Sequence, residues 1–453
     1  ALLQLLPLLF HGNHPGLPGF VSADTPCGVN DYQPETAALV AARQLVKDFA
    51  PDTRPRRNYA VRGLYLMGSP GTIAYTRGSD IDLWLMHAPD LSPAQVDLLR
   101  ARASAIEQYA AQLELEIHFF VMDAEQFGRG QSLALSEESS GSSQHYLLLD
   151  EFYRSGLLLA GLKPLWWLVP PEEEANYEAF VARELAPQPS LMQTHIDFGG
   201  LSSVPAGEFF GASVWQLYKS IDSPWKSVLK LLLVEAYATA YPETDQLLSL
   251  RHKRALLREG PRGHDLDPYI ALNQRVEEYL LAAGDEARLR LLRRALYLKT
   301  EVRLSLPADP REPPWRRRVV EQLVAGWGWT PAEIGHLDSR AHWRYAAARD
   351  ERREMVRALQ KSYAVLSEFA RASGDQRITQ LFAGNVGPEE TAHRAPLHRA
   401  QSLVAALAWS FFNRVCSPGT NWYCFVGGRR APAQGCRKVL ERLEAAFPTQ
   451  DPL

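Results

Sequence analysis

The sequence predicts an α+β protein in which a small mixed-sheet domain is followed by a larger, mainly helical domain. Three short runs of large apolar residues, at 61–67, 81–86 and 115–122, have the length and composition of strands. From residue 144 onward, apolar residues recur at the helical period over long segments. With 453 residues, 46% of them hydrophobic, the chain can form roughly two or three domains with cores of their own.

The elements follow one another in a simple order. A helical pattern at 35–49 stops at Pro51, the first two strands flank a polar turn at 68–78, and a helix at 93–113 leads to the third strand. Further helices are expected at 146–162, 208–241, 266–283, 286–304, 315–326 and 344–371. After a loop-like stretch at 372–396 come an expected helix at 400–412 and a candidate strand at 422–426. The predicted domains are 1–143, 144–371 and 372–453.

Composition and charge argue against several classes of protein. The 49 Lys and Arg nearly balance the 52 Asp and Glu, so no basic field for a nucleic-acid partner is indicated. The four cysteines form no C-x-x-C pair, which predicts neither a zinc site nor a disulfide framework and favours a cytoplasmic location. The apolar run at 1–10 lacks a basic start, so no signal peptide is expected, and no apolar run is long enough to span a membrane.

The pair Asp80 and Asp82 is the most informative chemical feature. Residues two apart on a strand share a face, so both carboxylates project together while Ile81 and Leu83 face a core. Two adjacent carboxylates repel each other unless a cation lies between them, and their hard oxygens suit Mg²⁺ or Mn²⁺ that also contact phosphates. An isolated D-x-D more often marks a solvated strand edge. The neighbouring motifs favour instead a two-metal phosphoryl or nucleotidyl transfer site.

Those neighbouring motifs are a Gly-Ser pair before the aspartates and an acidic strand after them. Gly68 lets the backbone approach a phosphate, and the Ser69 hydroxyl can donate to one; Ser79, next to Asp80, is a further candidate ligand contact. A third carboxylate is expected from the strand at 115–122. Glu114 and Glu116 share a face there with a histidine, and periodicity does not choose between the two glutamates.

The sequence resembles the class I adenylate cyclases of enterobacterial type over about residues 5–370. The resemblance is carried by GLYLMGSPGTIAYTRGSDIDLWLMH, LELEIHFFVMD, GSSQHYLLLDEFYRSGLLLAGLKPLWW, LSSVPAGEFFGASVWQLYKSIDSPWKSVLKLLLVEAY, LDPY and LVAGWGW. It implies a polymerase-beta-like nucleotidyltransferase domain, a helical nucleotide-binding domain, and conversion of ATP to cyclic AMP and pyrophosphate with two Mg²⁺ or Mn²⁺ ions. It also implies that Asp80 and Asp82 hold both ions and that Glu116 is the third carboxylate.

Two residues near these motifs have an alternative role in packing. Trp84 follows the aspartates on the same face, where it either stacks on adenine or walls the metal site, or simply packs as a core aromatic. Arg154 can reach a phosphate, but Asp150 lies four residues before it, so an ion pair within the helix is an equal alternative.

The helical domain supplies the remaining candidates. Related nucleotidyltransferases hold the triphosphate with a lysine and a serine from that domain, which the resemblance transfers to Lys219, Ser220 and Lys226 of the string KSIDSPWK. The alternative is a pair of solvated helix lysines. The chain departs from the family at Pro70, Tyr75 and Arg77, where small polar residues are typical, and it is shorter than the family around 374–396. Regulation by a protein of the sugar phosphotransferase system is implied for the full-length family enzyme only.

The residues by themselves support a two-metal nucleotidyltransferase, and the cyclic product is implied by the resemblance. One rival interpretation is intermolecular nucleotidyl transfer onto RNA, a protein or a small molecule by the same metal site. Another is a regulatory module that binds the nucleotide without turnover. The attack is predicted to come from the ribose 3′-hydroxyl of the same nucleotide, with Glu116 as proton acceptor.

Overall fold

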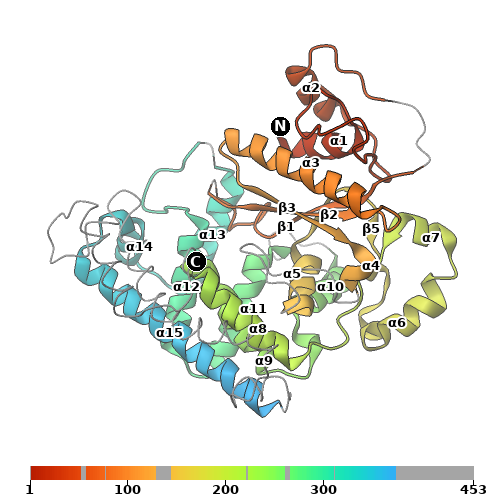
Figure 1. Cartoon of the computed structure of the whole chain (residues 1–453). Coiled ribbons are helices and arrows are strands. Elements are labelled where there is room, and N and C mark those ends of the chain that lie inside the picture. Colours follow the sequence, from red (N-terminus) through yellow and green to blue (C-terminus); the bar gives the residue numbers. More distant parts are fainter. Residues whose placement is uncertain are drawn as a thin grey trace, which may run out of the picture. The chain divides into compact units, whose positions relative to one another are not determined.

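The computed structural model describes residues 2–52, 58–76, 78–128, 144–220, 223–260, 266–310 and 312–373. It divides into two compact units: unit 1 comprises Ala1–Ala212 and Tyr237–Leu272, and unit 2 comprises Ser213–Ala236 and Asn273–Leu453. The predicted α+β class is confirmed, because a four-stranded sheet near the N-terminus is followed by mainly helical structure (Figure 1). The predicted domain boundaries at 143 and 371 stay predictions.

The sheet lies in unit 1 and has the strand order β3-β2-β1-β4. Its strands are β1 (Val61–Met67), β2 (Ile81–His87), β3 (Ile117–Asp123) and β4 (Leu157–Gly161). Strand β1 is antiparallel to both β2 and β4, whereas β2 and β3 are parallel. A parallel pair needs a crossover connection, which α3 (Pro93–Gln112) provides. The three strands expected from the sequence are therefore confirmed.

One face of the sheet packs on N-terminal helices. Alternate residues such as Leu64 and Leu83 belong to a core shared with α1 (Leu2–His11), α2 (Thr36–Leu45) and α3. Figure 1 shows α1 and α3 over this face. The apolar run at the start of the sequence is thus a core helix in which Phe10 is fully buried. Helix α3 begins with a capping box between Ser92 and Gln95, which satisfies its first backbone N–H groups.

The opposite face of the sheet carries a cluster of aromatic rings. Trp84 of β2 stacks on Phe152 of α5 (His145–Ser155), with ring centroids 4.4 Å apart and an interplanar angle of 9°. Phe198 packs edge-on against both Phe152 and Tyr65 of β1. Burying these large rings attaches α5 to the sheet, and Figure 1 shows α5 on the face opposite α3.

The prediction of a helix over 146–162 is wrong in its second half. Helix α5 ends at Ser155, Gly156 adopts an extended conformation, and the next five residues form edge strand β4. A short run of leucines fits a helix and a strand equally well by periodicity, and pairing with β1 decides for the strand here.

Most of the remaining helices agree closely with the other predicted segments, whereas α10 and α14 lie where the sequence analysis predicts no helix. They are α8 (Ala206–Lys219), α9 (Pro224–Ala238), α10 (Leu248–Glu259), α11 (Pro268–Ala282), α12 (Glu286–Thr300), α13 (Pro314–Trp327), α14 (Pro331–Asp338) and α15 (Tyr345–Ala372). The segment expected at 208–241 is two helices, because Pro224 starts a new helix and cannot continue the old one. The helix expected at 400–412 and the candidate strand at 422–426 lie outside the described residues.

Short elements connect these helices and strands. They are α4 (Ala124–Gly128), α6 (Tyr177–Phe180), α7 (Pro189–Thr194), the single-turn helices η2 (Leu165–Leu168), η3 (Pro171–Asn176), η4 (Val181–Leu185), η5 (Thr244–Gln246) and η7 (Arg340–His342), and the parallel pair β5 (Lys163–Pro164) and β6 (His195–Ile196).

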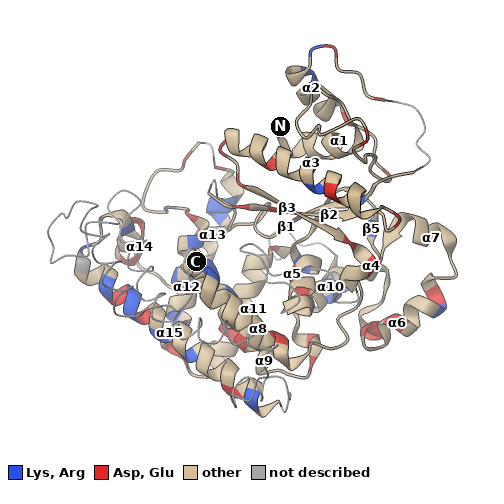
Figure 2. Cartoon of the chain, viewed as in Figure 1, with Lys and Arg blue, Asp and Glu red and all other residues tan. Residues whose placement is uncertain are grey.

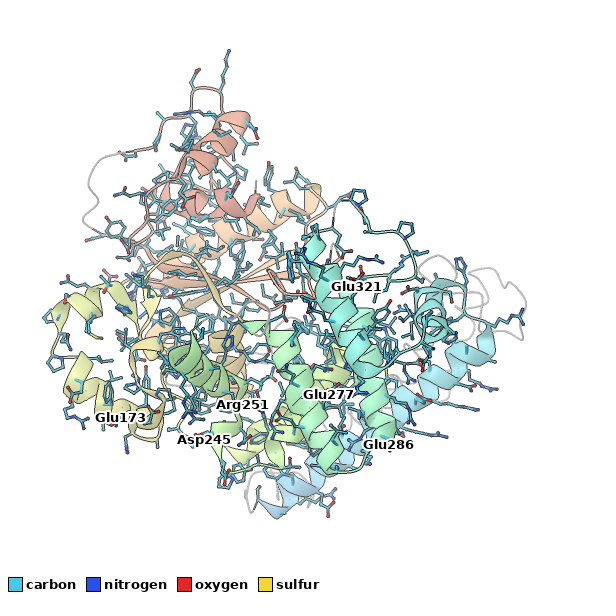
Figure 3. All side chains as sticks on the ribbon, turned by 180° about the vertical axis from the view of Figure 1, so that it is seen from behind. Glu173, Asp245, Arg251, Glu277, Glu286 and Glu321 are labelled. Atoms are coloured by element: carbon cyan, nitrogen blue, oxygen red, sulfur yellow. The ribbon has the colours of Figure 1, made fainter. Side chains whose placement is uncertain are left out.

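Unit 2 is held together by ion pairs as well as by apolar contacts. Arg288 of α12 donates from Nη1 to both carboxylate oxygens of Glu235 at 2.7 Å and from Nε to Asp285 at 2.7 Å. Arg293 of α12 donates to Glu277 of α11 at 2.8 Å, and Figure 3 labels Glu277. Along α15, basic and acidic residues are interspersed (Figure 2). In the part of the chain that the structure describes, no helix is long and apolar enough to cross a membrane.

We expect Gly161→Ala to destabilise the protein by roughly 2–4 kcal/mol. Gly161 has φ +105°, and a Cβ atom there would lie 2.6 Å from Gly63 Cα and would also clash with the carbonyl oxygen of Arg62. Urea denaturation measures the change. Gly199→Ala is the control, because Gly199 has φ +90° but its Cβ would meet only an ordinary contact at 3.8 Å. Equal destabilisation by the two changes would contradict the proposed clash between β4 and β1.

Candidate functional site

The predicted phosphate loop connects β1 to β2 and begins at Gly68. This glycine has φ +88°, a backbone conformation that other residues rarely adopt. A Cβ atom at Gly68 would lie 4.0 Å from Oδ2 of Asp82, so the aspartate carboxylate is beside the start of the loop. The Gly68 N–H donates to the Ser155 hydroxyl at the end of α5, with a distance of 3.4 Å. The loop therefore begins between the metal-ligand candidates and α5.

Hydrogen bonds within the loop fix its shape. The Thr72 hydroxyl donates to the carbonyl of Ser69 at 2.7 Å, and the Thr76 N–H donates to the Ser79 hydroxyl at 3.0 Å. The Ser79 side chain is thus used to hold the loop. Ser69 is buried, with 4% of its surface exposed, and its carbonyl oxygen accepts the bonds from Thr72. Predicted loop residue Arg77 lies outside those residues.

A long-range contact also holds this loop. The Ile73 N–H donates to Asp267 Oδ2 at 2.7 Å. Asp267 precedes α11, and its other oxygen accepts from the N–H groups of Tyr269 and Ile270 at 2.8 and 3.2 Å. One buried carboxylate therefore joins the middle of the loop to the start of a helix 194 residues away in the sequence.

Three of the predicted carboxylates lie at neighbouring strand ends. Asp80 and Asp82 are both half-buried, and Asp82 is in register with Met67 of β1 and His118 of β3. The Ile81 N–H donates to the carbonyl oxygen of Glu116 at 2.9 Å, which brings the Glu116 backbone next to Asp80. Glu114 lies in the preceding turn with φ +59° and is exposed. Its position favours Glu116 over Glu114 as the third carboxylate.

The side chain of Glu116 is not enclosed in a metal site. It is 67% exposed, and its Oε1 lies 3.3 Å from His118 Nε2. Within the described ranges, no three His, Cys, Asp or Glu side chains lie together in a ready metal site. The oxygen donors of Asp80 and Asp82 fit a hard divalent ion in their chemistry. The carboxylate of Glu116 offers the same oxygen chemistry from the neighbouring strand end.

Two of the predicted ligand contacts are buried and engaged in packing. Trp84 is 2% exposed, and its stacking partner is Phe152, which favours the packing alternative over adenine stacking. Arg154 forms the predicted pair with Asp150, with Nε 3.3 Å from Oδ2, and its side chain is 7% exposed. Asp150 also accepts from the Tyr237 hydroxyl at 3.0 Å and from the Ser249 N–H at 2.9 Å. This network makes a structural role the better-supported one for Arg154.

The three candidates of the helical domain belong to unit 2. Lys219 is the last residue of α8, half-buried, with Nζ 5.4 Å from the ring centroid of Trp215. Ser220 is fully buried, and its hydroxyl donates to the carbonyl of Leu217 at 2.7 Å, so it ends α8. Lys226 lies in the first turn of α9 and is half-buried. Both lysines carry an ammonium group, and the Ser220 hydroxyl donates back to α8.

Sequence reasoning gave no role to Ser155 or Asp267. The string LDPY was noted only as a shared string, although an aspartate followed by a proline is a typical helix start. That signal predicts the cap of α11. It carries no information about Ile73, because a contact across such a sequence separation depends on the tertiary fold.

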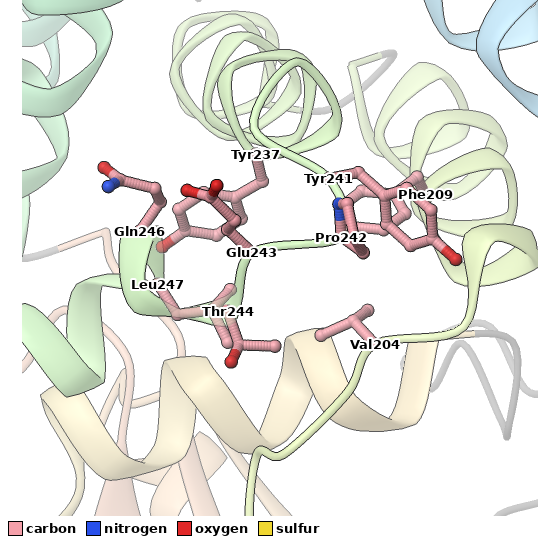
Figure 4. A pocket seen from close by; sticks show the side chains of 9 residues that line it. All are labelled: Val204, Phe209, Tyr237, Tyr241, Pro242, Glu243, Thr244, Gln246 and Leu247. Atoms are coloured by element: carbon pink, nitrogen blue, oxygen red, sulfur yellow. The ribbon is translucent and has the colours of Figure 1, made fainter. Parts of the chain in front are cut away.

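Among the described residues of unit 1, two cavities are relevant here. The smaller, of about 10 Å³, is lined by the residues drawn in Figure 4 and has room for about one water molecule. The larger, of about 340 Å³, is bordered by the aromatic residues Tyr65, Phe152 and Tyr153 and by Gly156. Its volume is in the usual range for a small-ligand site, and it adjoins the end of α5 that contacts the phosphate loop.

The start of α5 is held by a buried carboxylate from α8. Glu208 Oε2 accepts from the N–H groups of Tyr146 and Leu147 at 2.8 and 3.2 Å. Burial raises the pKa of Glu208 to about 7, although these backbone donors lower it in part. Helix α5 also carries Ser155, which contacts Gly68. Ionisation of Glu208 therefore changes the charge at the start of the helix whose end contacts the loop.

Family models match the chain along most of its length. An adenylate cyclase NT domain matches residues 1–167, the second domain of class I adenylate cyclase matches 204–381, and the third domain matches 380–451. No solved structure matches the chain.

Three similar proteins are all described as adenylate cyclases. The protein of Salmonella typhimurium is 41% identical over 370 residues, that of Escherichia coli strain K12 is 40% identical over 370, and that of Proteus mirabilis is 38% identical over 373. Each match covers 81% of this chain and 43% of the relative. The chain therefore spans less than half the length of these relatives.

We expect the free energy of unfolding to fall as the pH rises from about 4.5 to about 7 because of Glu208. In that window the folded protein binds more protons than the unfolded chain, whose glutamate has a pKa of 4.5. The loss amounts to about 3 kcal/mol when the window has been crossed. In Glu208→Gln the amide oxygen still accepts a hydrogen bond, but nothing titrates.

Urea denaturation of both proteins at about pH 5 and about pH 7.5 measures this difference. The wild-type protein should lose more stability between the two pH values than Glu208→Gln does. Parallel pH dependences would contradict a role for Glu208.

Proposed function

The chain belongs to the class I adenylate cyclase family, and we propose that it converts ATP into 3′,5′-cyclic AMP and pyrophosphate. The observation that carries this proposal is the pair of half-buried carboxylates, Asp80 and Asp82, beside the loop that starts at Gly68. Their oxygen donors and the hydroxyl of Ser69 suit a metal-bound triphosphate. The similarity to adenylate cyclases of known name supports the choice of product.

The reaction is an intramolecular displacement at phosphorus. The ribose 3′-oxygen bonds to the α-phosphorus, the bond from that phosphorus to the bridging oxygen breaks, and pyrophosphate leaves with the bond electrons. The hydroxyl proton passes to a base, for which Glu116 is the nearest candidate on the adjacent strand end. Because Glu116 is exposed, it can return that proton to water.

The resemblance to the family suggests a role for each remaining candidate. Asp80 and Asp82 would hold two divalent ions, Mg²⁺ or Mn²⁺, with Glu116 completing the site of one. Such ions, when bound, lower the pKa of the attacking hydroxyl and neutralise charge on the leaving group. The Ser69 hydroxyl would donate to a phosphate oxygen, and Lys219 and Lys226 would balance the triphosphate charge. Ser79 and Ser220 hold local turns through their hydroxyls.

The product distinguishes this reaction from its rivals. Incubation of the protein with ATP and Mg²⁺ or Mn²⁺ should release cyclic AMP and pyrophosphate in equal amounts. Chromatography and mass spectrometry identify the products. A linear oligonucleotide or a covalent AMP adduct would indicate intermolecular transfer instead, and ATP binding without pyrophosphate release would indicate a regulatory module.

Substitution of the aspartates tests the metal-ligand assignment. Asp80→Asn and Asp82→Asn should each lower the rate of cyclic AMP formation by about 10³-fold, because a neutral amide binds a divalent ion far more weakly. Initial rates measure this loss, and thermal unfolding checks that each variant folds. Wild-type activity in either variant would rule out this metal site.

A matched pair of glutamates tests the third carboxylate. Glu116→Gln should lower the rate by about 10²-fold through loss of a proton acceptor. Glu114→Gln, two residues earlier in the turn, should leave the rate within about twofold, since Glu114 lies outside the strand end. If the two changes reduced the rate equally, Glu116 would have no special role.

A further inference from the structure

We propose that Asp267 is a positioning residue that sets the conformation of the Gly68–Ser79 loop for phosphate binding. The inference rests on the proposed function, because it concerns the same loop. Asp267 lies far from the D-x-D motif in sequence. The proposed role does not require Asp267 to contact the substrate. Its carboxylate acts through the backbone of Ile73.

The carboxylate bridges two structural elements of unit 1. Oδ2 accepts from the Ile73 N–H at 2.7 Å, in the middle of the loop. Oδ1 accepts from Tyr269 and Ile270 at the first turn of α11. Asp267 is 9% exposed, and Ile73 is fully buried, so water does not easily replace these bonds. The helix start and the loop are therefore fixed to each other by one side chain.

The position of Ile73 makes this contact relevant to ligand binding. The segment from Ser69 to Thr72 is closed by hydrogen bonds from Thr72 to Ser69, and Thr76 is bonded to Ser79. Ile73 lies between these two local turns. A displacement of Ile73 would move the Ser69 hydroxyl at one end and Asp80 at the other, while each turn kept its internal bonds.

Substitution of Asp267 can separate the roles of its two carboxylate oxygens. Asparagine caps helices about as well as aspartate, so Asp267→Asn retains an oxygen for the N–H groups of Tyr269 and Ile270. Its amide NH₂ then faces the Ile73 N–H, and two donors cannot bond to each other. Asp267→Ala removes both contacts. Asparagine thus removes the connection to the loop and keeps the helix cap.

Hydrogen exchange tests the connection without reference to activity. In Asp267→Asn, peptides from 69–79 should exchange faster than in wild type, whereas peptides from α11 should keep their protection. In Asp267→Ala both regions should exchange faster. Unchanged exchange of the loop in both variants would overturn the proposal, whether or not the protein proves to be a cyclase.

Steady-state kinetics and pyrophosphate inhibition test the consequence for ligands. The KM for ATP and the inhibition constant of pyrophosphate should each rise about tenfold in Asp267→Asn, as expected for loss of one well-placed phosphate contact. Ser92→Ala is the matched control, because it removes the cap of α3 in the same unit without touching the loop. It should leave both constants unchanged.

The outcomes separate the inference from the proposed function. An inactive wild-type protein would refute the cyclase assignment alone, since hydrogen exchange still tests the connection. An active wild-type protein with unchanged constants in Asp267→Asn would refute the positioning role. A rise in both constants for Ser92→Ala as well would also refute it, because general loss of stability would then explain the effect.

Discussion

The antiparallel pairing of β1 with β2 is the constraint on which the rest of the site depends. Its register sets Met67 opposite Asp82, so the loop that leaves β1 must begin beside the carboxylate that β2 presents. The parallel pairing of β2 with β3 adds Glu116 at the same edge through the bond from Ile81. Backbone hydrogen bonding alone thus brings three acidic residues at two strand ends next to the loop that begins at Gly68. A shift of one residue would turn Asp82 toward the apolar core.

The two faces of the sheet have different roles: one packs on the main core, and the other carries the helix that contacts the loop. The face toward α1 and α3 packs on a mainly apolar core, and the carboxylate of Glu107 in α3 accepts from the Phe119 N–H of β3 at 2.7 Å. The other face attaches α5 through the stacking of Trp84 on Phe152, and α5 in turn contacts the loop through Ser155. The Asp150 carboxylate there is well satisfied, since it receives bonds from Tyr237 and Ser249 as well as the charge of Arg154. Such partners offset the cost of burying an ion pair.

The sequence predicted the strands and most helices because their apolar periods are long and their boundaries carry proline or capping residues. It failed where a short apolar run has no unique period: the residues of β4 were assigned to a helix, and α1 was not foreseen as a core helix. Within the site, the D-x-D strand and the Gly-Ser pair were recognisable from spacing. The choice between Glu114 and Glu116 and the packing of Trp84 depended on strand ends and neighbouring rings.

By itself the sequence determined the chemistry: two aspartates two residues apart, a Gly-Ser turn before them and an α+β order of elements. Local spacing suffices for these because strand alternation fixes which side chains share a face. Only the tertiary structure decided which side chains are available to a ligand. Trp84, Arg154 and Ser220 are buried with partners, whereas Asp267 and Ser155 hold the loop from distant segments. Those contacts join residues far apart in the chain, and no local pattern encodes them.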